Sequence, residues 1–317
     1  MNFLVTGGAG FIGSHLVRGL LGRGHAVRVL DDFSSGRRDN LHDTIADIDL
    51  IEGSAANTET AARACADMDV VLHQAAIPSV PRSIDNPAAS HVANTDGTFQ
   101  LLLAARDAGV RRFVYAASSS AYGETPLLPK VESMPTSPLS PYAVQKLSGE
   151  HYCKVFHDCY GLSTIALRYF NVFGPYQNPK SQYAAAIPAF ITAILQGESP
   201  KVYGDGEQTR DFTYIENVIE ANRLAAEAKE VHGEAVNIAC GASISVNRII
   251  AMINERLGTN VRPNYVPNRP GDIRDSWADI RLARERIGYA PIVDIAEGLN
   301  KTIEWYQARS HAGSVNT

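Results

Sequence analysis

The chain has 317 residues, of which 45% are hydrophobic and 20% charged, ordinary values for a globular protein of about two domains. Its 34 acidic residues outnumber its 29 Lys and Arg residues, and the net charge of −5 argues against nucleic acid as the main partner. Four cysteines without CxxC spacing, no N-terminal signal peptide and no apolar run of the ~20 residues that span a bilayer predict a cytoplasmic protein with free thiols, no metal site and no membrane contact.

Short apolar runs alternate with helical patterns in the first half of the chain. Strands are expected at residues 2–6, 26–30, 50–52, 69–73, 112–117 and 163–169, and helices at 11–22, 88–108 and 141–160. Continuous β-branched runs separated by helices are typical of a parallel sheet that is covered on both faces. With right-handed crossovers, the pattern predicts an α/β fold with a doubly wound parallel sheet of the Rossmann type.

The pattern changes after Asn171. Residues 172–180 contain a glycine and two prolines and are expected to form a loop. Helices are then expected at 183–196, 215–229, 245–257 and 294–308, with a strand at 236–239 among them. We therefore expect residues 1–175 to form one domain and residues 176–317 to form mainly a smaller C-terminal α/β lobe. The segment from about 211 to 240 is a candidate to return to the first domain.

A glycine-rich loop stands between the first strand and the first helix. Gly8, Gly10 and Gly13 match GxGxxG, while Gly7, Gly10 and Gly13 match GxxGxxG. Glycine is needed there because the chain must turn tightly and let a pyrophosphate approach backbone N–H groups at a helix N-terminus. An ordinary tight turn is the alternative, but the strand–loop–helix context predicts a dinucleotide site.

Asp31 and Asp32 end the second strand, where an acidic side chain can accept hydrogen bonds from the adenosine ribose. A carboxylate there would repel a 2′-phosphate, so NAD is favoured over NADP as the cofactor. Arg37 and Arg38 follow closely and keep NADP open. A turn or helix-capping role is the alternative for the aspartates, and it suits Asp32 better than Asp31.

Ser140 and Pro141 suit the start of a helix, which places Tyr142 and Lys146 four residues apart on one helical face. Tyrosine is more often a core residue than a catalyst, and the lysine is what makes the pair chemically useful. Its positive charge favours tyrosinate, so we expect the pKa of Tyr142 to be drawn toward the working pH. The tyrosine would then remove a hydroxyl proton while a nicotinamide takes the carbon-bound hydride.

A run of three serines, Ser118 to Ser120, follows the strand expected at 112–117. Ligands of open α/β sheets bind at this end of the strands, where a serine can hydrogen-bond a substrate oxygen as it becomes a carbonyl. A polar turn is the alternative. Together with the glycine loop and the tyrosine–lysine pair, in that order, the serines predict an NAD-dependent enzyme.

At this point the chain resembles the extended short-chain dehydrogenase/reductase family, and within it the nucleotide-sugar 4-epimerases. The resemblance runs from about residue 2 to residue 306. It rests on segments whose order and spacing are specific: TGGAGFIG (6–13), HQAA (73–76), SSSAYG (118–123), YAVQK (142–146), RYFNVFGP (168–175), GDGEQTRDF (204–212) and RPGDI (269–273).

The resemblance implies that Tyr142 is the catalytic base, that Lys146 is its partner and cofactor anchor, and that Ser118 binds the substrate hydroxyl. Counting back from Tyr122 favours Ser118 for this role, with Ser119 as the alternative.

The same resemblance implies which residues contact NAD. Asn94 would steady the surroundings of the catalytic lysine, Ala75 would line the cofactor channel, and Tyr169 would contact the nicotinamide end. The family usually holds the adenine with an aspartate after the third strand, whereas this chain has Ser54 there, which carries no charge. The implied NAD contacts are Gly7, Gly10, Phe11, Ile12, Gly13, Asp31, Asp32, Ser54, Ala55, Gln74, Ala75, Ala76, Asn94, Tyr142, Lys146 and Tyr169.

A UDP-sugar is the implied substrate. Arg210 and Arg269 offer planar donors that suit a pyrophosphate, and Asp272 can accept from ribose hydroxyls. Without the surrounding motifs, surface arginines in weak ion pairs would be the simpler interpretation. The implied substrate contacts are Ser118, Ser119, Tyr142, Asn171, Val202, Tyr203, Arg210, Arg269, Asp272 and Ser276.

Three hypotheses about the activity follow. In a UDP-sugar 4-epimerase, hydride moves to NAD, the 4-keto sugar rotates, and hydride returns to its other face. A related dehydratase or decarboxylase would need an acidic side chain immediately after the catalytic serine, where this chain has Ser119 and Ser120. A non-catalytic NAD-sensing or scaffolding protein would not need the intact set of Ser118, Tyr142 and Lys146. These comparisons favour the epimerase.

Ser276 aligns with the position that gates the 2-substituent of the sugar in this family. A tyrosine there would crowd an N-acetyl group, whereas serine leaves room. We therefore expect UDP-N-acetylglucosamine and UDP-N-acetylgalactosamine as substrates, with UDP-glucose and UDP-galactose as further ones. Arg82 could meet the carboxylate of a uronic acid, although a surface role is the simpler interpretation. The resemblance also implies a homodimer formed through the helices expected at 88–108 and 141–160.

Overall fold

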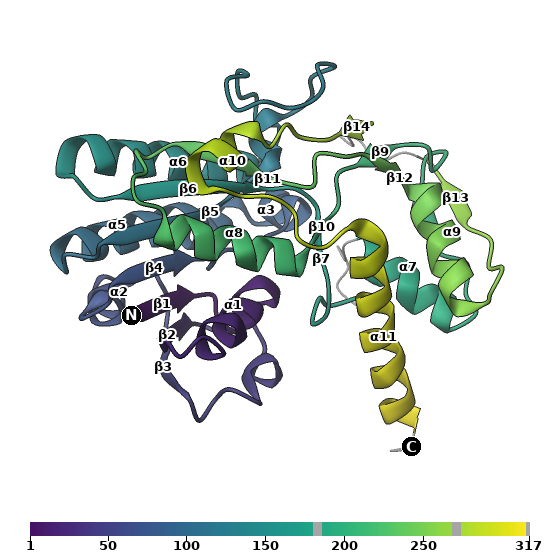
Figure 1. Ribbon diagram of the computed structural model, residues 1–317, viewed down its shortest axis with the longest axis horizontal. Helices are drawn as coiled ribbons and strands as arrows, with labels where there is room; N and C mark the ends of the chain where they lie inside the picture. Colours follow the sequence, from purple (N-terminus) through teal and green to yellow (C-terminus); the bar gives the residue numbers. More distant parts are fainter. Residues whose placement is uncertain (180–185, 268–273, 315–317) are drawn as a thin grey trace.

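A parallel sheet of seven strands forms the centre of the computed structural model, which describes residues 1–179, 186–267 and 274–314 (Figure 1). The strand order is β11-β6-β5-β4-β1-β2-β3, and every neighbouring pair is parallel. The strands are β1 (Asn2–Thr6), β2 (Ala26–Asp31), β3 (Ile48–Glu52), β4 (Val70–His73), β5 (Arg112–Ser118), β6 (Thr164–Tyr169) and β11 (Ala235–Ile238). The predicted doubly wound sheet is confirmed.

Side chains of alternating strand residues enter two separate cores, one on each face of the sheet. In β1, Phe3 and Val5 pack with α1 (Phe11–Leu21) and α8 (Ile215–Glu227). Leu4 points to the opposite core, which is formed with α2 (Thr58–Cys65), α5 (Gly97–Asp107) and α6 (Pro141–Tyr160). Both faces of the sheet are therefore covered, which explains why its strands have continuous apolar runs.

The helix expected at 88–108 is not one regular α-helix. The structure has α3 (Val80–Asp85) and α4 (Pro87–His91), then a π-helical segment at Val92–Asp96 before α5 begins. Asn86 ends α3 and caps α4 by accepting the N–H of Ala89 at 3.1 Å. The wider π-helical turn was missed because local apolar spacing does not distinguish it from an α-helical turn.

The C-terminal lobe consists of helices and short strand pairs beside the sheet (Figure 1). Its helices are α7 (Ala186–Leu195), α9 (Val246–Leu257) and α11 (Ile295–Ser314). One pair joins β8 (Lys201–Tyr203) to β13 (Asn264–Val266), and β10 (Thr213–Tyr214) pairs with β7 (Val172–Phe173). A small sheet has the order β12 (Ile244–Ser245), β9 (Thr209–Arg210) and β14 (Asp275–Ser276).

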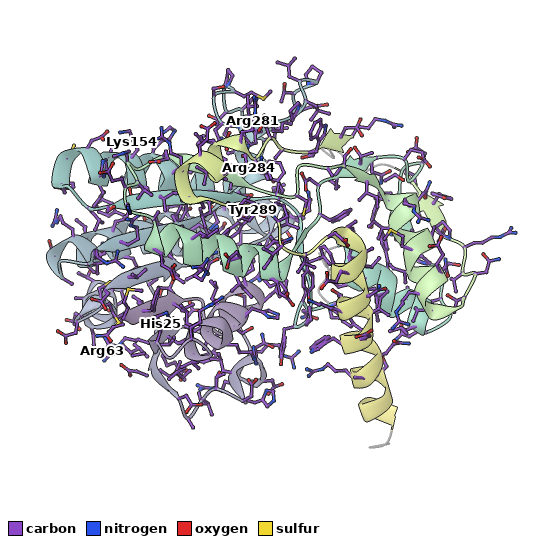
Figure 2. The ribbon with its side chains drawn as sticks, viewed as in Figure 1. His25, Arg63, Lys154, Arg281, Arg284 and Tyr289 are labelled. Carbon is purple, nitrogen blue, oxygen red and sulfur yellow. The ribbon has the colours of Figure 1, made fainter. Side chains whose placement is uncertain are left out.

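Besides α8, two parts of the C-terminal half return to the main sheet. The strand expected at 236–239 is β11, which pairs in parallel with β6. The helix α10 (Arg281–Ile287), which the sequence patterns did not predict, packs on β11. Arg281 and Arg284 project from α10 in Figure 2, whereas Tyr289 is buried and its hydroxyl donates to the carbonyl of Ala239 at 2.9 Å. Among the described residues, no helix has the length and apolar character needed to cross a bilayer.

The contact between α6 and β5 depends on the absence of a side chain at Gly149. A Cβ atom there would lie 2.3 Å from the ring carbon Cζ and the hydroxyl oxygen of Tyr115, which is fully buried. We predict that Gly149→Ala lowers the free energy of unfolding by about 1–3 kcal/mol, because the buried ring must shift. Urea unfolding would measure the change.

Gly97→Ala is the matched control for this substitution. Its Cβ would lie 3.5 Å from the nearest atom, an ordinary contact, and alanine favours the helix by roughly 0.5–1 kcal/mol over glycine. The control should therefore be as stable as the unaltered protein or more stable. Equal effects of the two substitutions would contradict the steric interpretation.

Candidate active site

The predicted cofactor and catalytic residues meet at one edge of the sheet, because parallel strands all end on the same side. The glycine loop follows β1, Asp31 ends β2, residues 74–76 follow β4, Ser118 ends β5 and Tyr169 ends β6. Residues that are far apart in the sequence therefore surround one position, as expected for an open α/β sheet. Phe11, Ile12 and Ala76 are half-buried at this edge, and Ala55 is buried.

The glycine loop leaves no room for side chains. Gly7 has a φ of 67°, and a Cβ atom there would lie 2.7 Å from the backbone nitrogen of Ala75. A Cβ on Gly13 would lie 2.1 Å from the carbonyl oxygen of Gly7. Gly10 is the N-cap of α1 and supplies no side-chain hydrogen bond to the helix. The first N–H groups of α1 are therefore available to an anion such as a pyrophosphate.

Both aspartates after β2 accept hydrogen bonds from nearby backbone groups. The buried Asp31 carboxylate accepts the N–H groups of Ala9 and Phe33, each at 2.8 Å. Burial raises its pKa, and these two bonds act in the opposite direction. The exposed Asp32 accepts the N–H of Ser34 at 2.9 Å. The turn role expected mainly for Asp32 is thus shared by Asp31, which also holds the glycine loop through Ala9.

The two arginines that left NADP open are engaged in ion pairs. Arg37 pairs with Asp39 at 3.1 Å, and Arg38 pairs with Glu52 at the end of β3. These contacts offset both charges beside the adenosine position. Ser54, which stands where the family usually has an aspartate, accepts the N–H of Ala56 at 3.2 Å and so forms a turn after β3.

The serine, tyrosine and lysine predicted to be catalytic come together between β5 and α6. The Ser118 side chain lies near the phenol of Tyr142 and acts to lower its pKa. Ser118 also accepts the hydroxyl of Ser120 at 2.9 Å. Lys146 is buried; its Nζ donates to the carbonyl of Ala116 at 2.9 Å. The geometry favours Ser118 over Ser119 as the partner of the tyrosine.

The expected lowering of the Tyr142 pKa is wrong for the protein by itself. Burial raises the pKa of Tyr142, and the bond with Ser118 offsets only part of that shift. The Lys146 ammonium is directed to the carbonyl of Ala116, and burial lowers its own pKa to about 8, with the Glu150 carboxylate acting in the opposite direction. Sequence spacing showed that the pair shares a helical face, but it could not show how strongly burial acts on both groups.

Asn94 links the π-helical segment to the catalytic helix. Its Oδ1 accepts the N–H of Ile77 at 2.7 Å, and its Nδ2 donates to Oε1 of Gln145 at 2.9 Å. Gln145 also accepts the hydroxyl of Ser90 at 2.6 Å. Asn94 therefore contacts the residue next to Lys146, while its predicted effect on the lysine itself stays a prediction.

Two further contacts at this edge were missed by sequence reasoning. The Tyr169 hydroxyl accepts Nδ2 of Asn222 at 2.8 Å and lies 3.2 Å from Nε2 of Gln74. His73 is fully buried, with Nδ1 2.7 Å from Thr6 Oγ1 and Nε2 2.9 Å from Thr98 Oγ1. Asn222 follows no recognised motif, and the HQAA segment pointed only to the residues after His73.

Three of the predicted substrate residues meet at the small sheet of the lobe. Ser276 is paired in register with Arg210, and the N–H of Asp211 donates to the Ser276 carbonyl at 2.8 Å. Nδ2 of Asn171 donates to the carbonyl of Asp211 at 2.9 Å. Nη1 of Arg210 donates to the carbonyl of Arg274 at 2.8 Å. Asn171, Arg210 and Ser276 are therefore connected through a single backbone segment.

The remaining substrate predictions lie on β8 or outside the described residues. Val202 is buried and Tyr203 is half-buried on β8. The carbonyl of Tyr203 accepts Nε2 of Gln208 at 2.7 Å, close to the start of β9. Arg269 and Asp272 lie outside the described residues.

Comparison with known proteins agrees with this geometry. The model of the NAD dependent epimerase/dehydratase family matches residues 3–239. The chain belongs to this family. The predicted relationship to the extended short-chain dehydrogenases/reductases is thereby confirmed.

Several proteins that are similar to this chain are UDP-sugar 4-epimerases. It is 38% identical to UDP-glucose 4-epimerase of Mycolicibacterium smegmatis over 98% of this chain and 100% of that protein. A structure of UDP-N-acetylglucosamine 4-epimerase from Methanobrevibacter ruminantium in complex with UDP-N-acetylmuramic acid has 41% identity and a TM-score of 0.93, covering 97% of this chain and 98% of that one. UDP-glucose 4-epimerase from Thermotoga maritima with UDP-glucose has 37% identity and a TM-score of 0.93, covering 98% and 100%.

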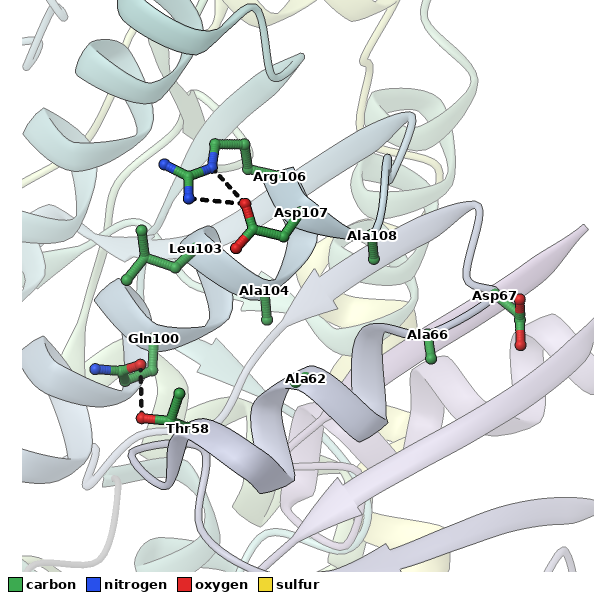
Figure 3. Close-up of a pocket in the computed structure, with 10 residues that line it drawn as sticks. All are labelled: Thr58, Ala62, Ala66, Asp67, Gln100, Leu103, Ala104, Arg106, Asp107 and Ala108. Carbon is green, nitrogen blue, oxygen red and sulfur yellow. Dashed lines mark hydrogen bonds and ion pairs between the residues drawn. The ribbon is translucent and has the colours of Figure 1, made fainter.

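A groove of about 530 Å³ between α2 and α5 does not belong to the site of this family member (Figure 3). Ala62 and Ala104 line it, and Thr58 at one end donates to Gln100 at 3.1 Å. The groove contains no residue of the glycine loop or of the catalytic set.

The buried His73 should make the stability of the folded protein depend on pH. Burial lowers its pKa from 6.5 to about 3, so the folded protein keeps it neutral while the unfolded chain takes up a proton below about pH 6.5. Its contribution to stability is present above pH 6.5 and is lost as the pH falls toward 3. As the pH falls across that window, we expect the free energy of unfolding of the unaltered protein to decrease relative to that of His73→Gln, by at most about 1.4 kcal/mol per pH unit. Urea unfolding at several pH values would measure it, and a constant difference would contradict the prediction.

Proposed function

We propose that the protein is a UDP-sugar 4-epimerase that interconverts UDP-N-acetylglucosamine and UDP-N-acetylgalactosamine, with UDP-glucose and UDP-galactose as further substrates. The observation that carries this proposal is that α6 brings Tyr142 and Lys146 to the end of β5, beside Ser118 and at the same sheet edge as the glycine loop. The similar proteins named above include UDP-glucose and UDP-N-acetylglucosamine 4-epimerases.

Each catalytic side chain has a separate task in this proposal. Tyr142 removes the proton from the sugar 4-hydroxyl and later returns one to it, while Ser118 hydrogen-bonds the same oxygen as it becomes a carbonyl. NAD held by the glycine loop and Asp31 would supply the hydride acceptor for C4, and its positive charge would favour the tyrosinate form of Tyr142. Lys146 adds a second positive charge and is anchored by the Ala116 carbonyl.

A dehydratase or decarboxylase is the alternative within the same family. Such enzymes place an acid immediately after the catalytic serine, whereas here the residues are Ser119 and Ser120. The Ser120 hydroxyl donates to Ser118 at 2.9 Å and so supports the serine without supplying an acid. A non-catalytic NAD-binding protein would have no need for the preserved contact between Ser118 and Tyr142.

The division of work between the two halves is part of the proposal. Residues 1–175 would hold NAD, with β11 completing their sheet, and residues 176–317 would mainly bind the UDP-sugar. NAD is favoured over NADP because Asp31 lies beside the glycine loop and the nearby Arg37 and Arg38 are paired with carboxylates.

We infer the oligomeric state from exposed apolar side chains and the cellular compartment from buried free thiols. Val144, Val155 and Tyr160 are exposed apolar side chains on α6, and a homodimer formed through α5 and α6 would bury them. Cys65 and Cys153 are buried free thiols, which supports a reducing compartment, the cytoplasm.

The activity is tested by incubating the purified protein with UDP-sugars and no added NAD. We expect each substrate to reach a mixture with its 4-epimer, because the bound cofactor is regenerated in every cycle. Tyr142→Phe should lower kcat by at least about a hundredfold while retaining bound NAD, since it removes only the group that transfers the proton. Product identification by NMR and the NAD content per chain are the measurements.

Other products would decide between the alternatives. A 4-keto-6-deoxy sugar would indicate a dehydratase, and a pentose would indicate a decarboxylase. Full activity of Tyr142→Phe would overturn the assignment of the base. Tyr265→Phe, which removes an exposed phenol hydroxyl bonded to Asn247, is the matched control and should keep both turnover and bound NAD.

Ser276 provides a test of sugar selectivity. Its backbone is held in register with Arg210, so a larger side chain at this position would enter the space beside the proposed UDP site. We expect Ser276→Tyr to reduce kcat/KM for UDP-N-acetylglucosamine by about tenfold or more, with a much smaller effect on UDP-glucose, because only the N-acetyl group is crowded. Ser276→Ala is the control and should leave the ratio unchanged. If Ser276→Tyr turned over UDP-N-acetylglucosamine as fast as the unaltered protein, the proposed gating role of Ser276 would be wrong.

A further inference from the structure

Asp211 makes an unusual number of contacts for a residue that is not expected to touch a ligand. It lies between Arg210 and Phe212 and is fully buried. Its carboxylate accepts the backbone N–H groups of Cys240 at 2.8 Å, Gly241 at 3.0 Å and Ala278 at 3.3 Å. One side chain therefore holds two separate backbone segments, one directly after β11 and one directly after β14.

The backbone of Asp211 makes two further connections. Its N–H donates to the carbonyl of Ser276 at 2.8 Å, and its carbonyl accepts Nδ2 of Asn171 at 2.9 Å. Arg210 precedes it directly in β9. Asp211 is thus bonded to two of the proposed substrate residues and is covalently joined to the third.

Backbone donors partly offset the effect of burial on the Asp211 carboxylate. Burial raises the pKa of Asp211 to about 6, while the bonds from Cys240, Gly241 and Ala278 oppose that shift. The Asp211 carboxylate acts on the Cys240 thiol and the Tyr289 phenol, whose pKa values are raised mainly by burial, so both groups are neutral at pH 7. At neutral pH the carboxylate is therefore charged and meets backbone donors, an arrangement that strengthens each hydrogen bond.

We propose that Asp211 is a positioning residue for the UDP-sugar pocket, which fixes Asn171, Arg210 and Ser276 relative to the end of β11. The inference rests on the proposed function, because it assigns those three residues to the substrate. Asp211 itself acts through its backbone partners and needs no contact with the sugar nucleotide. Its carboxylate joins the segment after β11, in the sheet that would carry NAD, to the segment after β14 in the small sheet of the lobe.

Asparagine at this position tests the proposal because it has the same shape and lacks the second acceptor. Its NH2 group would face one of the N–H donors that the carboxylate now accepts, and at least one backbone segment would lose its anchor. We expect Asp211→Asn to raise KM for UDP-N-acetylglucosamine by about tenfold, with kcat changed by less than about threefold. The content of bound NAD should stay unchanged.

Asn254→Asp is the matched control, because it is the reverse exchange in the same lobe. Asn254 holds the backbone of Val261 through both its Oδ1 and its Nδ2, each at 3.0 Å. None of the Asp211 bonds described above involves Asn254 or Val261. The control loses one backbone anchor of the same kind, so it measures a general effect on the lobe. An equal rise in KM for the two variants, or an unchanged KM in folded Asp211→Asn, would overturn the proposal.

A second measurement covers the case in which Asp211→Asn does not fold. In the unaltered holoenzyme, UDP alone should slow hydrogen exchange at the N–H groups of Cys240, Gly241 and Ala278, because binding at one end of a linked unit stabilises the other. The N–H of Val261, held by Asn254, should exchange at the same rate with and without UDP. No slowing at the three amides in the presence of saturating UDP would overturn the proposal.

The proposed function and the positioning role of Asp211 would be contradicted by different results. If the unaltered enzyme forms no 4-epimer from any UDP-sugar, the proposed function is wrong. If it forms the epimer but Asp211→Asn has the KM of the unaltered enzyme, the function stands and the positioning role is wrong.

Discussion

The close approach of backbone segments at the end of β1 is the constraint on which the cofactor edge depends. A Cβ on Gly13 would lie 2.1 Å from the Gly7 carbonyl, and one on Gly7 would lie 2.7 Å from the nitrogen of Ala75. Without side chains at these positions, α1 starts directly against β1 and beside the end of β4. The N–H groups of α1 then face the place where the strands end, and Asp31 fixes the loop by accepting the N–H of Ala9 at 2.8 Å.

A second set of contacts fixes the catalytic helix on the neighbouring strands. Gly149 lets α6 pack directly on the Tyr115 ring of β5. The next residue of α6, Glu150, forms an ion pair with Arg168 at 2.7 Å with both side chains buried, which joins α6 to β6. Burying two charges costs solvation free energy, so such a pair contributes more to a defined geometry than to net stability. The result is that Tyr142 and Lys146 reach the end of β5, beside Ser118.

The lobe is attached to this framework by a shared apolar core and by backbone contacts. Residues of β7 and β10 pair with each other, and Asp211 connects the small sheet to the segment after β11. These contacts connect the proposed site for NAD to the proposed site for the UDP-sugar.

Local spacing along the chain determined the features that depend on neighbouring residues. Apolar runs predicted the parallel sheet, the glycines predicted the turn before α1, and the four-residue interval placed Tyr142 and Lys146 on one helical face. These predictions succeed because backbone sterics and helical periodicity act over a few residues. The family motifs added Ser118, whose contact with Tyr142 the structure contains.

Only the tertiary structure decided the features that depend on burial and on partners far away in the sequence. Burial raises the pKa of Tyr142, although the adjacent lysine alone predicted the opposite, because desolvation depends on every element packed around the phenol. The register between Ser276 and Arg210 and the buried contacts of Asp211 likewise join segments that are 29 to 67 residues apart. Sequence spacing could place Tyr142 and Lys146 on one helix. The solvation of these two groups and the positions of the proposed substrate residues depend on the tertiary fold.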